Sequence, residues 1–237
     1  MSRAVDLVER FGAVVVAPGY RLSWQAPYPA ALHDCYATLL WMRDHAARLG
    51  VNPAQLMVGG ESAGGGIAAS LAMLARDRGQ VRVAYQMPLY PMIDNLDTWS
   101  SVDNHAKIWN TRRNHQAWHL YLREDAHSAS VSPYAAPARQ TDHAGLPPAY
   151  TFVGTAEPFY AETLAYVEAL RAAGVPAEVD VYEGMYHAFD MMEPDLPESV
   201  AARERFCERF AWAMEHCFAP QGVPSVSPTT GSGPAAS

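Results

Sequence analysis

At residues 56–66 the chain reads Leu56-Met57-Val58-Gly59-Gly60-Glu61-Ser62-Ala63-Gly64-Gly65-Gly66. Three apolar residues lead into the G-x-S-x-G sequence around Ser62, and residues 67–78, which are rich in Ala, Leu and Met, follow it with helical spacing. This order predicts a strand, a tight turn and a helix. A serine in that setting is typical of a nucleophile elbow, a strained turn at the carboxyl edge of a sheet.

The residues beside Ser62 have predicted roles in this turn. Gly60 and Gly64 omit side chains that would collide where the strand and the helix pass close together. The backbone N–H of Ala63, at the start of the helix, is expected to point at an oxyanion formed on a carbonyl that Ser62 attacks. The alternative is a glycine-rich turn that only connects a strand to a helix, and the strand and helix context favours the functional interpretation.

Composition limits the class of protein. The chain has 237 residues, of which 49% are hydrophobic and 18% charged, as in a single large globular domain. Its formal net charge is −8 and it has no basic block, so nucleic acid is not expected as a partner. No signal peptide or membrane span is predicted, which favours a cytoplasmic location. Cys35, Cys207 and Cys217 lack metal-type spacing and are expected to be reduced and buried or half-buried.

Strand and helix patterns alternate along the chain. Short apolar runs predict strands at residues 13–17, 56–60, 81–87, 149–154 and 178–182. Amphipathic patterns predict helices at residues 2–11, 30–49, 67–78, 160–173 and 197–217. This alternation predicts an α/β fold whose predominantly parallel sheet, of about five strands, has helices on both faces. Ligands of such sheets collect at the carboxyl ends of the strands.

Two segments depart from the alternation. Residues 95–146 mix polar and aromatic side chains, with one predicted helix at residues 114–123, and are interpreted as a cap-like insertion. Its tryptophans could line a pocket for an acyl or alcohol group, or form the insertion's own small core; they are Trp99, Trp109 and Trp118. Residues 219–237 are rich in Pro, Ser, Thr and Gly and are expected to be disordered.

Two further loops carry the groups that a serine nucleophile needs. A serine hydroxyl reacts poorly unless a base takes its proton, and the base needs an acid that holds its tautomer. Glu157 follows the predicted strand at 149–154, and His187 follows the predicted strand at 178–182. Nucleophile, acid and base in this chain order, each after its own strand, is the order expected of an α/β-hydrolase.

Several motifs occur together in a fixed order along the chain. They are Tyr20-Arg21-Leu22, Pro29-Ala30-Ala31-Leu32-His33-Asp34, Gly59-Gly60-Glu61-Ser62-Ala63-Gly64-Gly65, Ser132-Pro133-Tyr134-Ala135 and Tyr186-His187-Ala188-Phe189. This set resembles the hormone-sensitive-lipase-like, or type IV, family of bacterial carboxylesterases. The resemblance implies an α/β-hydrolase catalytic domain over residues 1–218, with Ser62 as nucleophile, His187 as base and an acid at position 157.

The acid is less sharply defined than the other two residues. The family usually has aspartate at this position, and the extra methylene of Glu157 changes its reach. Glu162 is the alternative acid, although its place on a helix favours a solvated side chain. His115 and His119 are four residues apart, as metal ligands on a helix can be, but no glutamate lies between them in zinc-peptidase fashion. No metal or other cofactor is therefore predicted.

The implied function is hydrolysis of small, fairly apolar carboxylic esters through an acyl-enzyme on Ser62. A small-molecule ester is the expected partner, and a homodimer is left open. Members of the family also carry a His-Gly-Gly-Gly segment, whose glycine N–H groups form most of the oxyanion hole, before the strand that corresponds to residues 13–17. This sequence has no such segment, and one lost oxyanion donor costs about 10²- to 10³-fold in rate.

The sequence is therefore interpreted as truncated at its amino terminus, with an empty strand position between residues 13–17 and 56–60. Either residues 13–17 move inward to pair with the elbow strand, or the fragment is unstable and associates through an exposed apolar surface. The alternative function is a catalytically impaired or inactive remnant of the hydrolase fold that acts by binding.

Overall fold

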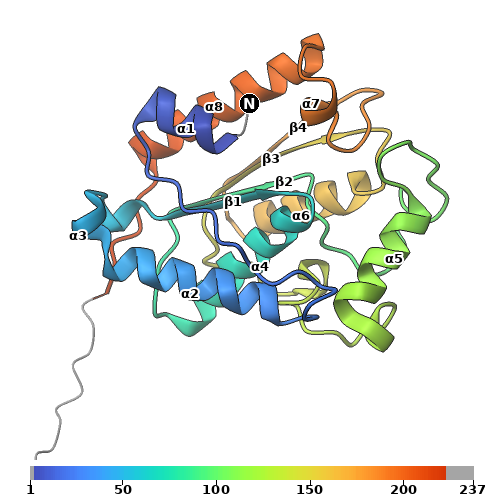
Figure 1. Ribbon diagram of the computed structural model, residues 1–237, viewed down its shortest axis with the longest axis horizontal. Helices are drawn as coiled ribbons and strands as arrows, with labels where there is room; N and C mark the ends of the chain where they lie inside the picture. Colours follow the sequence, from blue (N-terminus) through green and yellow to red (C-terminus); the bar gives the residue numbers. More distant parts are fainter. Residues whose placement is uncertain (1–2, 223–237) are drawn as a thin grey trace, which may run out of the picture.

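The computed structural model describes residues 3–222, which form three layers with a parallel sheet between two layers of helices (Figure 1). The strands are β1 (Met57–Glu61), β2 (Tyr85–Leu89), β3 (Ala149–Gly154) and β4 (Ala177–Tyr182), and they pair in this order. The helices are α1 (Arg3–Phe11), α2 (Ala30–Asp44), α3 (Ala46–Leu49), α4 (Ala63–Arg78), α5 (Thr111–Leu122), α6 (Tyr160–Ala172), α7 (Phe189–Met192) and α8 (Pro197–His216). Three 3-10 turns lie at Pro53–Gln55, Arg123–Asp125 and Pro137–Arg139. The predicted α/β fold with helices on both faces is confirmed.

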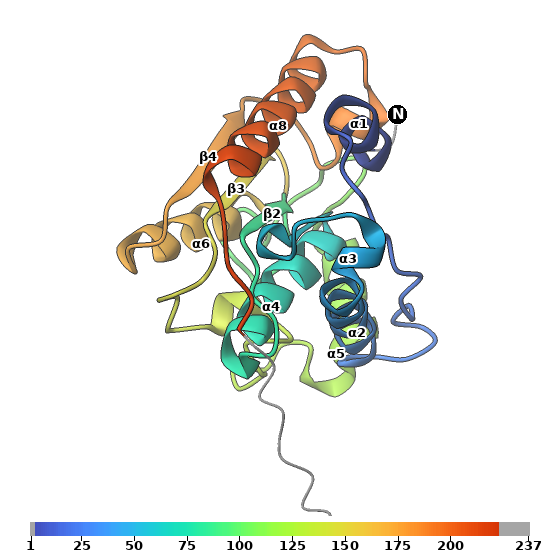
Figure 2. The ribbon, with the colours of Figure 1, turned by 90° about the vertical axis from the view of Figure 1, so that its left-hand side faces the viewer.

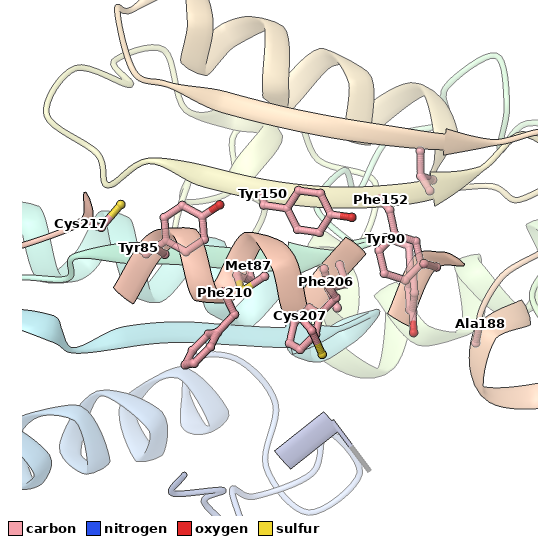
Figure 3. Close-up of a cluster of buried hydrophobic side chains, with 14 of the residues drawn as sticks. Tyr85, Met87, Tyr90, Tyr150, Phe152, Ala188, Phe206, Cys207, Phe210 and Cys217 are labelled. Atoms are coloured by element: carbon pink, nitrogen blue, oxygen red, sulfur yellow. The ribbon is translucent and has the colours of Figure 1, made fainter. Parts of the chain in front are cut away.

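Helices α1 and α8 cover one face of the sheet, and Figure 2 shows α2 and α4 on the opposite side. Beneath α8 the strands present aromatic side chains, among them Tyr85, Tyr150 and Phe152, to Phe206 and Phe210 of the helix (Figure 3). Large rings buried in this way supply much of the stabilising apolar area in a core. They fix α8 over the sheet.

Helix α1 is held on the same face by aromatic packing. The rings of Phe11 and Phe210 lie 5.3 Å apart between centroids, and Leu7 also packs against this cluster. On the other face, α4 packs against β1 and β2, while α6 covers the side of β3 and β4. The apolar stripes of both layers therefore meet the sheet, as the helical spacing predicts.

Residues 13–17 do not form the predicted fifth strand. After Gly12, whose φ is +63°, they cross irregularly from α1 on one face towards α2 on the other (Figure 1). Within residues 3–222 no backbone hydrogen bond joins them to β1, and Val14 and Val15 are exposed. A strand needs a neighbour for its N–H and C=O groups, and a β-branched composition does not supply one. The sheet of the described residues therefore has four strands with β1 at its edge, and the expected inward movement is wrong.

Other boundaries differ by smaller amounts. The predicted helix at 30–49 breaks at His45, whose N–H and Nδ1 both lie within 3.0 Å of the carbonyl oxygen of Trp41. Strand β2 begins at Tyr85, because its register is set by parallel pairing with Met57 of β1. Helix α5 starts earlier than predicted, where the side chain of Asn110 accepts a hydrogen bond from the N–H of Arg113 and caps the helix.

The chain around residue 220 is attached to the body of the protein. The N–H of Ala219 donates to the carbonyl oxygen of Ala54 at 2.7 Å. The amide of Gln221 bonds to both the N–H and the C=O of Arg82, each at 2.9 Å, and donates to the carbonyl of Pro53. Residues 219–222 therefore differ from the disorder expected for this segment, and the remaining residues, 223–237, lie outside the described part of the chain.

The three cysteines are free and buried, which confirms the prediction for Cys35, Cys207 and Cys217. Each thiol lies in apolar surroundings, and burial raises its pKa, to about 11 for Cys35. Thiols of raised pKa carry little thiolate and react slowly. As for membranes, none of the helices described between residues 3 and 222 is both long enough and apolar enough to cross a bilayer.

Candidate active site

Ser62 lies on a strained turn between β1 and α4. Its φ of 56° and ψ of −120° are unusual for a residue with a side chain, and such backbone strain persists only where neighbouring contacts hold it. The Ser62 N–H donates to the carbonyl of Leu89, and the Ser62 carbonyl accepts from the N–H groups of Gly66 and Met92, all at 3.0 Å. These bonds attach the turn to the end of β2. The predicted strand, turn and helix are thus present.

The backbone segments around Ser62 pass so close to one another that some of the flanking positions have no room for a side chain. A Cβ atom on Gly60 would lie 2.5 Å from the carbonyl oxygen of Gly64, so this predicted role is confirmed. A Cβ on Gly64 would meet nothing within 4 Å, so its predicted role is wrong. The restriction falls instead on Gly65 and Gly66, where a Cβ would lie 2.9 Å from the carbonyl oxygen of Leu89 and 2.2 Å from that of Met92, respectively. The reason is that α4 begins against the loop after β2, which the sequence pattern does not reveal.

His187 and Glu157 lie within hydrogen-bonding distance of each other and of the serine. His187 Nε2 is 2.9 Å from Ser62 Oγ, and His187 Nδ1 is 2.5 Å from Glu157 Oε2. The other oxygen of Glu157 accepts a hydrogen bond from the N–H of Gly154 at 3.1 Å. The structure therefore brings together the three residues singled out in the sequence.

Burial shapes the electrostatics of this group. The Glu157 side chain is 0% exposed, and its burial raises the pKa of the carboxyl above the usual value, while the hydrogen bond to His187 opposes that shift. In a dry environment a carboxylate and an imidazolium attract each other more strongly than in water. Glu157 and His187 are thus held in contact with each other away from water.

The loops that carry Glu157 and His187 are bonded to each other. A Cβ on Gly154 would lie 2.1 Å from the carbonyl oxygen of Met185, so the two loops pass in close contact there. The N–H of Ala156 donates to the same carbonyl at 3.0 Å, and the N–H of Gly184 donates to the hydroxyl of Thr155 at 2.8 Å. These contacts fix the spacing of acid and base.

Aromatic rings surround the imidazole of His187. Phe159 and Tyr90 meet it edge to face, with centroids 5.0 and 5.1 Å away, and the Trp109 ring lies at 5.9 Å. Such rings exclude water from the pair of His187 and Glu157. The sequence singled out Trp109 but missed Tyr90 and Phe159, although both follow the ends of predicted strands.

The other two tryptophans of residues 95–146 lie apart from the imidazole. Trp118 is fully buried in a small cluster with Met92, Leu122 and Phe159, as expected of a core residue of the insertion. Trp99 is 72% exposed and its ring packs edge to face on Tyr160. Of the three, only Trp109 therefore touches the site.

Glu162 is not the partner of His187, and its predicted solvation is wrong. Its side chain is 2% exposed, and Oε1 accepts hydrogen bonds from the N–H groups of Ile93 and Asp94 at 2.8 and 3.1 Å. Burial raises the pKa of Glu162 well above its usual value. The residue lies on the face of α6 that packs inward, which helical periodicity alone did not distinguish from the flank.

The remaining predicted residues are Ala63, His115 and His119. Ala63 is exposed and is the first residue of α4, so its N–H has no acceptor within the helix and lies directly beside Ser62. His115 Nε2 lies 2.7 Å from Asp97 Oδ1, and His119 takes no part in that contact. Between residues 3 and 222 no group of three or more His, Cys, Asp or Glu side chains could hold a metal ion.

The chain is similar in sequence to known proteins. The sequence pattern of the alpha/beta hydrolase fold matches residues 3–191. The chain is 33% identical over 196 residues to Esterase LipI and 34% identical over 199 residues to Carboxylesterase NlhH, both of Mycobacterium tuberculosis. Each of these matches covers 81% of this chain and 61% of the relative, so the chain spans less than two thirds of their length.

Solved structures give the same result. The structure of a bacterial heroin esterase superimposes with a TM-score of 0.79 and 34% identity, covering 82% of this chain and 62% of that one. Esterase LipW from Mycobacterium marinum superimposes with a TM-score of 0.84 and 32% identity, covering 90% and 67%.

Proposed function

The chain belongs to the alpha/beta hydrolase fold family, and from this premise we propose that it hydrolyses carboxylic esters with Ser62 as nucleophile, His187 as general base and Glu157 as the acid that orients the base. The observation that carries the proposal is the continuous contact from Ser62 Oγ through His187 to Glu157, with distances of 2.9 and 2.5 Å. Similarity to named esterases and carboxylesterases supports the same class of reaction.

Acylation follows from this contact. Ser62 Oγ attacks the ester carbonyl carbon while its proton passes to His187 Nε2. Glu157 accepts a hydrogen bond from Nδ1–H of His187, which holds the imidazole in the correct tautomer and stabilises the imidazolium. The N–H of Ala63 donates to the oxyanion of the tetrahedral intermediate. His187 then gives its proton to the leaving alcohol, and an acyl group remains on Ser62.

Deacylation repeats these steps with water. His187 takes a proton from the attacking water, whose oxygen bonds to the acyl carbon. Collapse of the second tetrahedral intermediate breaks the bond to Ser62 Oγ, which recovers its proton from His187. The products are a carboxylic acid and an alcohol, and no cofactor takes part.

Small, fairly apolar esters are the proposed substrates. Tyr90 and Phe159 pack behind the imidazole and are fully buried, so a substrate group that reaches His187 meets the half-buried ring of Trp109. Apolar groups gain free energy on leaving water for such a surface, whereas a charged group would lose its hydration.

Labelling by a fluorophosphonate tests the proposal, because the reagent reacts with activated serines. We expect one equivalent of label per chain by intact mass, located on Ser62. Ser62→Ala should take no label and should lose roughly 10⁵-fold in kcat for p-nitrophenyl acetate. His187→Ala should also lose labelling, whereas His143→Ala, which removes a buried histidine packed on Tyr166, should retain it.

The alternative, a remnant that acts by binding, predicts a different outcome. A folded, monodisperse protein that takes no label and turns over no ester faster than Ser62→Ala would contradict catalysis and favour that alternative.

A further inference from the structure

The side chain of Arg3 lies between two carboxylates that neighbour the catalytic pair in the sequence. Arg3 Nε donates to Glu61 Oε1 at 2.7 Å, and Arg3 Nη2 donates to Asp190 Oδ2. Glu61 immediately precedes Ser62, and Asp190 follows His187 by three residues on α7. One guanidinium from α1 thus joins the end of β1 to the helix after the His187 loop.

Burial and stacking restrict the position of this guanidinium. The Asp190 side chain is 4% exposed and that of Arg3 is 13% exposed, so their ion pair is largely shielded from water. The Arg3 guanidinium carbon also lies 5.1 Å from the ring centroid of Phe206 and 5.4 Å from that of Phe152. A planar cation between two rings and two carboxylates has little freedom to move.

Tyr90 connects this ion pair to the imidazole. Its ring meets both Phe152, at 5.2 Å, and His187, at 5.1 Å, and Figure 3 shows it beside Phe152. Tyr90 has a φ of 33°, an unusual value for a tyrosine. Its buried hydroxyl has no hydrogen-bond partner among the described residues, and neither does Asp190 Oδ1. Tyr90 thus contacts both the imidazole of His187 and the ring of Phe152 on which Arg3 stacks.

The two sides joined by Arg3 are otherwise attached to different elements. Backbone hydrogen bonds of Ser62 run to Leu89 and Met92, at the end of β2. Those of the His187 loop run to Thr155 and Ala156, after β3. A direct link between the turn at Ser62 and the loop of His187 has to join these two attachments. Arg3 makes such a link, because it bonds to both Glu61 and Asp190.

We propose that Arg3 is a positioning residue, which holds Ser62 Oγ and His187 Nε2 at hydrogen-bonding distance by joining Glu61 to Asp190. The inference rests on the proposed esterase function, because it assigns Arg3 a task in that reaction. Misplacement of a reacting group by about 1 Å can cost about 10²-fold in rate, so a cation remote from the chemistry can control it.

Arg3→Gln should lower kcat about 10- to 100-fold and change KM by less than about threefold. It should also move the acidic limb of the kcat/KM profile to higher pH, because the carboxylates of both Glu61 and Asp190 lose their cation beside the site. The variant leaves unchanged the other ionisable side chains that contact His187, namely Glu157 after β3 and Tyr90 after β2. Arg3→Lys keeps the charge but reaches one carboxylate less well, so its loss should be intermediate.

A matched control separates this role from the attachment of α1. Arg10 lies on the same helix and forms two hydrogen bonds of 2.8 Å with Glu204, away from the site. Arg10→Gln removes the same charge from the same helix and should leave kcat, KM and the pH profile unchanged. In addition, Asp190→Asn combined with Arg3→Gln should recover thermal stability but not kcat, because the buried uncompensated carboxylate is gone while the link to Glu61 stays broken.

The experiment compares the full chain and these variants by kcat and KM for p-nitrophenyl acetate between about pH 5 and pH 9, and by thermal unfolding. Proton NMR gives a readout that needs no turnover, namely the low-field resonance of the proton between His187 Nδ1 and Glu157 Oε2, assigned by its absence in Glu157→Gln. Arg3→Gln should shift or broaden this resonance, and Arg10→Gln should leave it in place.

Loss of stability with unchanged kcat, pH profile and low-field resonance in Arg3→Gln would overturn the inference, as would an equal loss of kcat in Arg10→Gln. If Arg3→Gln does not fold, Arg3→Lys and Asp190→Asn decide by the same measurements. If the wild-type chain hydrolyses no ester, the proposed function fails, and the resonance alone decides whether Arg3 positions His187.

Discussion

His187 Nδ1 lies 2.5 Å from Glu157 Oε2, and both side chains are buried. Glutamate has one methylene more than aspartate. The Glu157 carboxylate turns back towards the end of β3, where it accepts a hydrogen bond from the N–H of Gly154, and so still meets the imidazole. The extra length is thus absorbed by a local hydrogen bond. This contact makes Glu157 the acid to test.

Glu157→Gln should preserve the fold and lower kcat about 10³- to 10⁴-fold, because an amide at this position can favour the wrong tautomer of His187. Steady-state kinetics and far-ultraviolet circular dichroism measure the two effects. Glu162→Gln is the matched control: its amide oxygen can still accept from Ile93 and Asp94, so activity should be retained. A loss confined to Glu162→Gln would reverse the assignment.

The buried Glu162 carboxyl should make stability depend on pH. Because burial raises its pKa well above 4.5, the folded protein binds this proton more tightly than the unfolded chain does. Its contribution to stability is therefore complete below the unfolded pKa and is lost as pH rises through the folded pKa. Glutamine does not titrate, so Glu162→Gln does not lose stability in this way. The urea midpoint of Glu162→Gln minus that of the wild type should therefore be larger at about pH 8 than at about pH 5. A difference that stays constant or shrinks with pH would argue against a raised pKa.

The glycines after Ser62 offer a test with an internal comparison. Gly66→Ala places a Cβ 2.2 Å from the carbonyl oxygen of Met92, and we expect a loss of about 3 kcal/mol or more in the free energy of unfolding. Gly64→Ala meets no atom within 4 Å, so it should be neutral or stabilise the helix by up to about 1 kcal/mol. Urea denaturation of both variants checks the contrast. Equal effects would mean that the backbone contact at Met92 is not restrictive.

Trp109 should influence the choice of substrate. Its ring lies beside both His187 and Phe159, so Trp109→Ala should enlarge the space near the imidazole and raise the ratio of kcat/KM for p-nitrophenyl hexanoate over acetate by about tenfold. Trp99→Ala removes an equally large but 72% exposed ring and should leave the ratio unchanged. An equal change of this ratio in both variants would mean that Trp109 does not determine the substrate preference.

Local patterns were sufficient to predict the elements that carry the site. The elbow at Ser62 and the loops with Glu157 and His187 each follow a short apolar strand whose pairing partners are also in the chain. The β-branched run at residues 13–17 has the same composition and yet forms no strand, because hydrogen-bonding partners cannot be read from a strand's own sequence.

Contacts between distant residues were beyond such patterns. Arg3 belongs to an amphipathic helix in the sequence, and nothing there relates it to Glu61, 58 residues on, or to Asp190, 187 residues on. Glu162 has helical spacing that suits either a flank or an inward face, and only packing against the loop after β2 shows which. Similarly, the aromatic contacts of Tyr90 and Phe159 with His187 depend on how three loops meet.

The link between Arg3 and Asp190 also has a consequence for synthesis on the ribosome. At about 5–20 residues per second, roughly 10–40 s separate the appearance of these two residues, and α8 emerges later still. During this interval Leu7 and Phe11 of α1 lack the helix that covers them in the finished protein. A nascent chain therefore exposes the apolar side of this amphipathic helix before the surface that buries it exists, and assembly of the site is one of the last steps of folding.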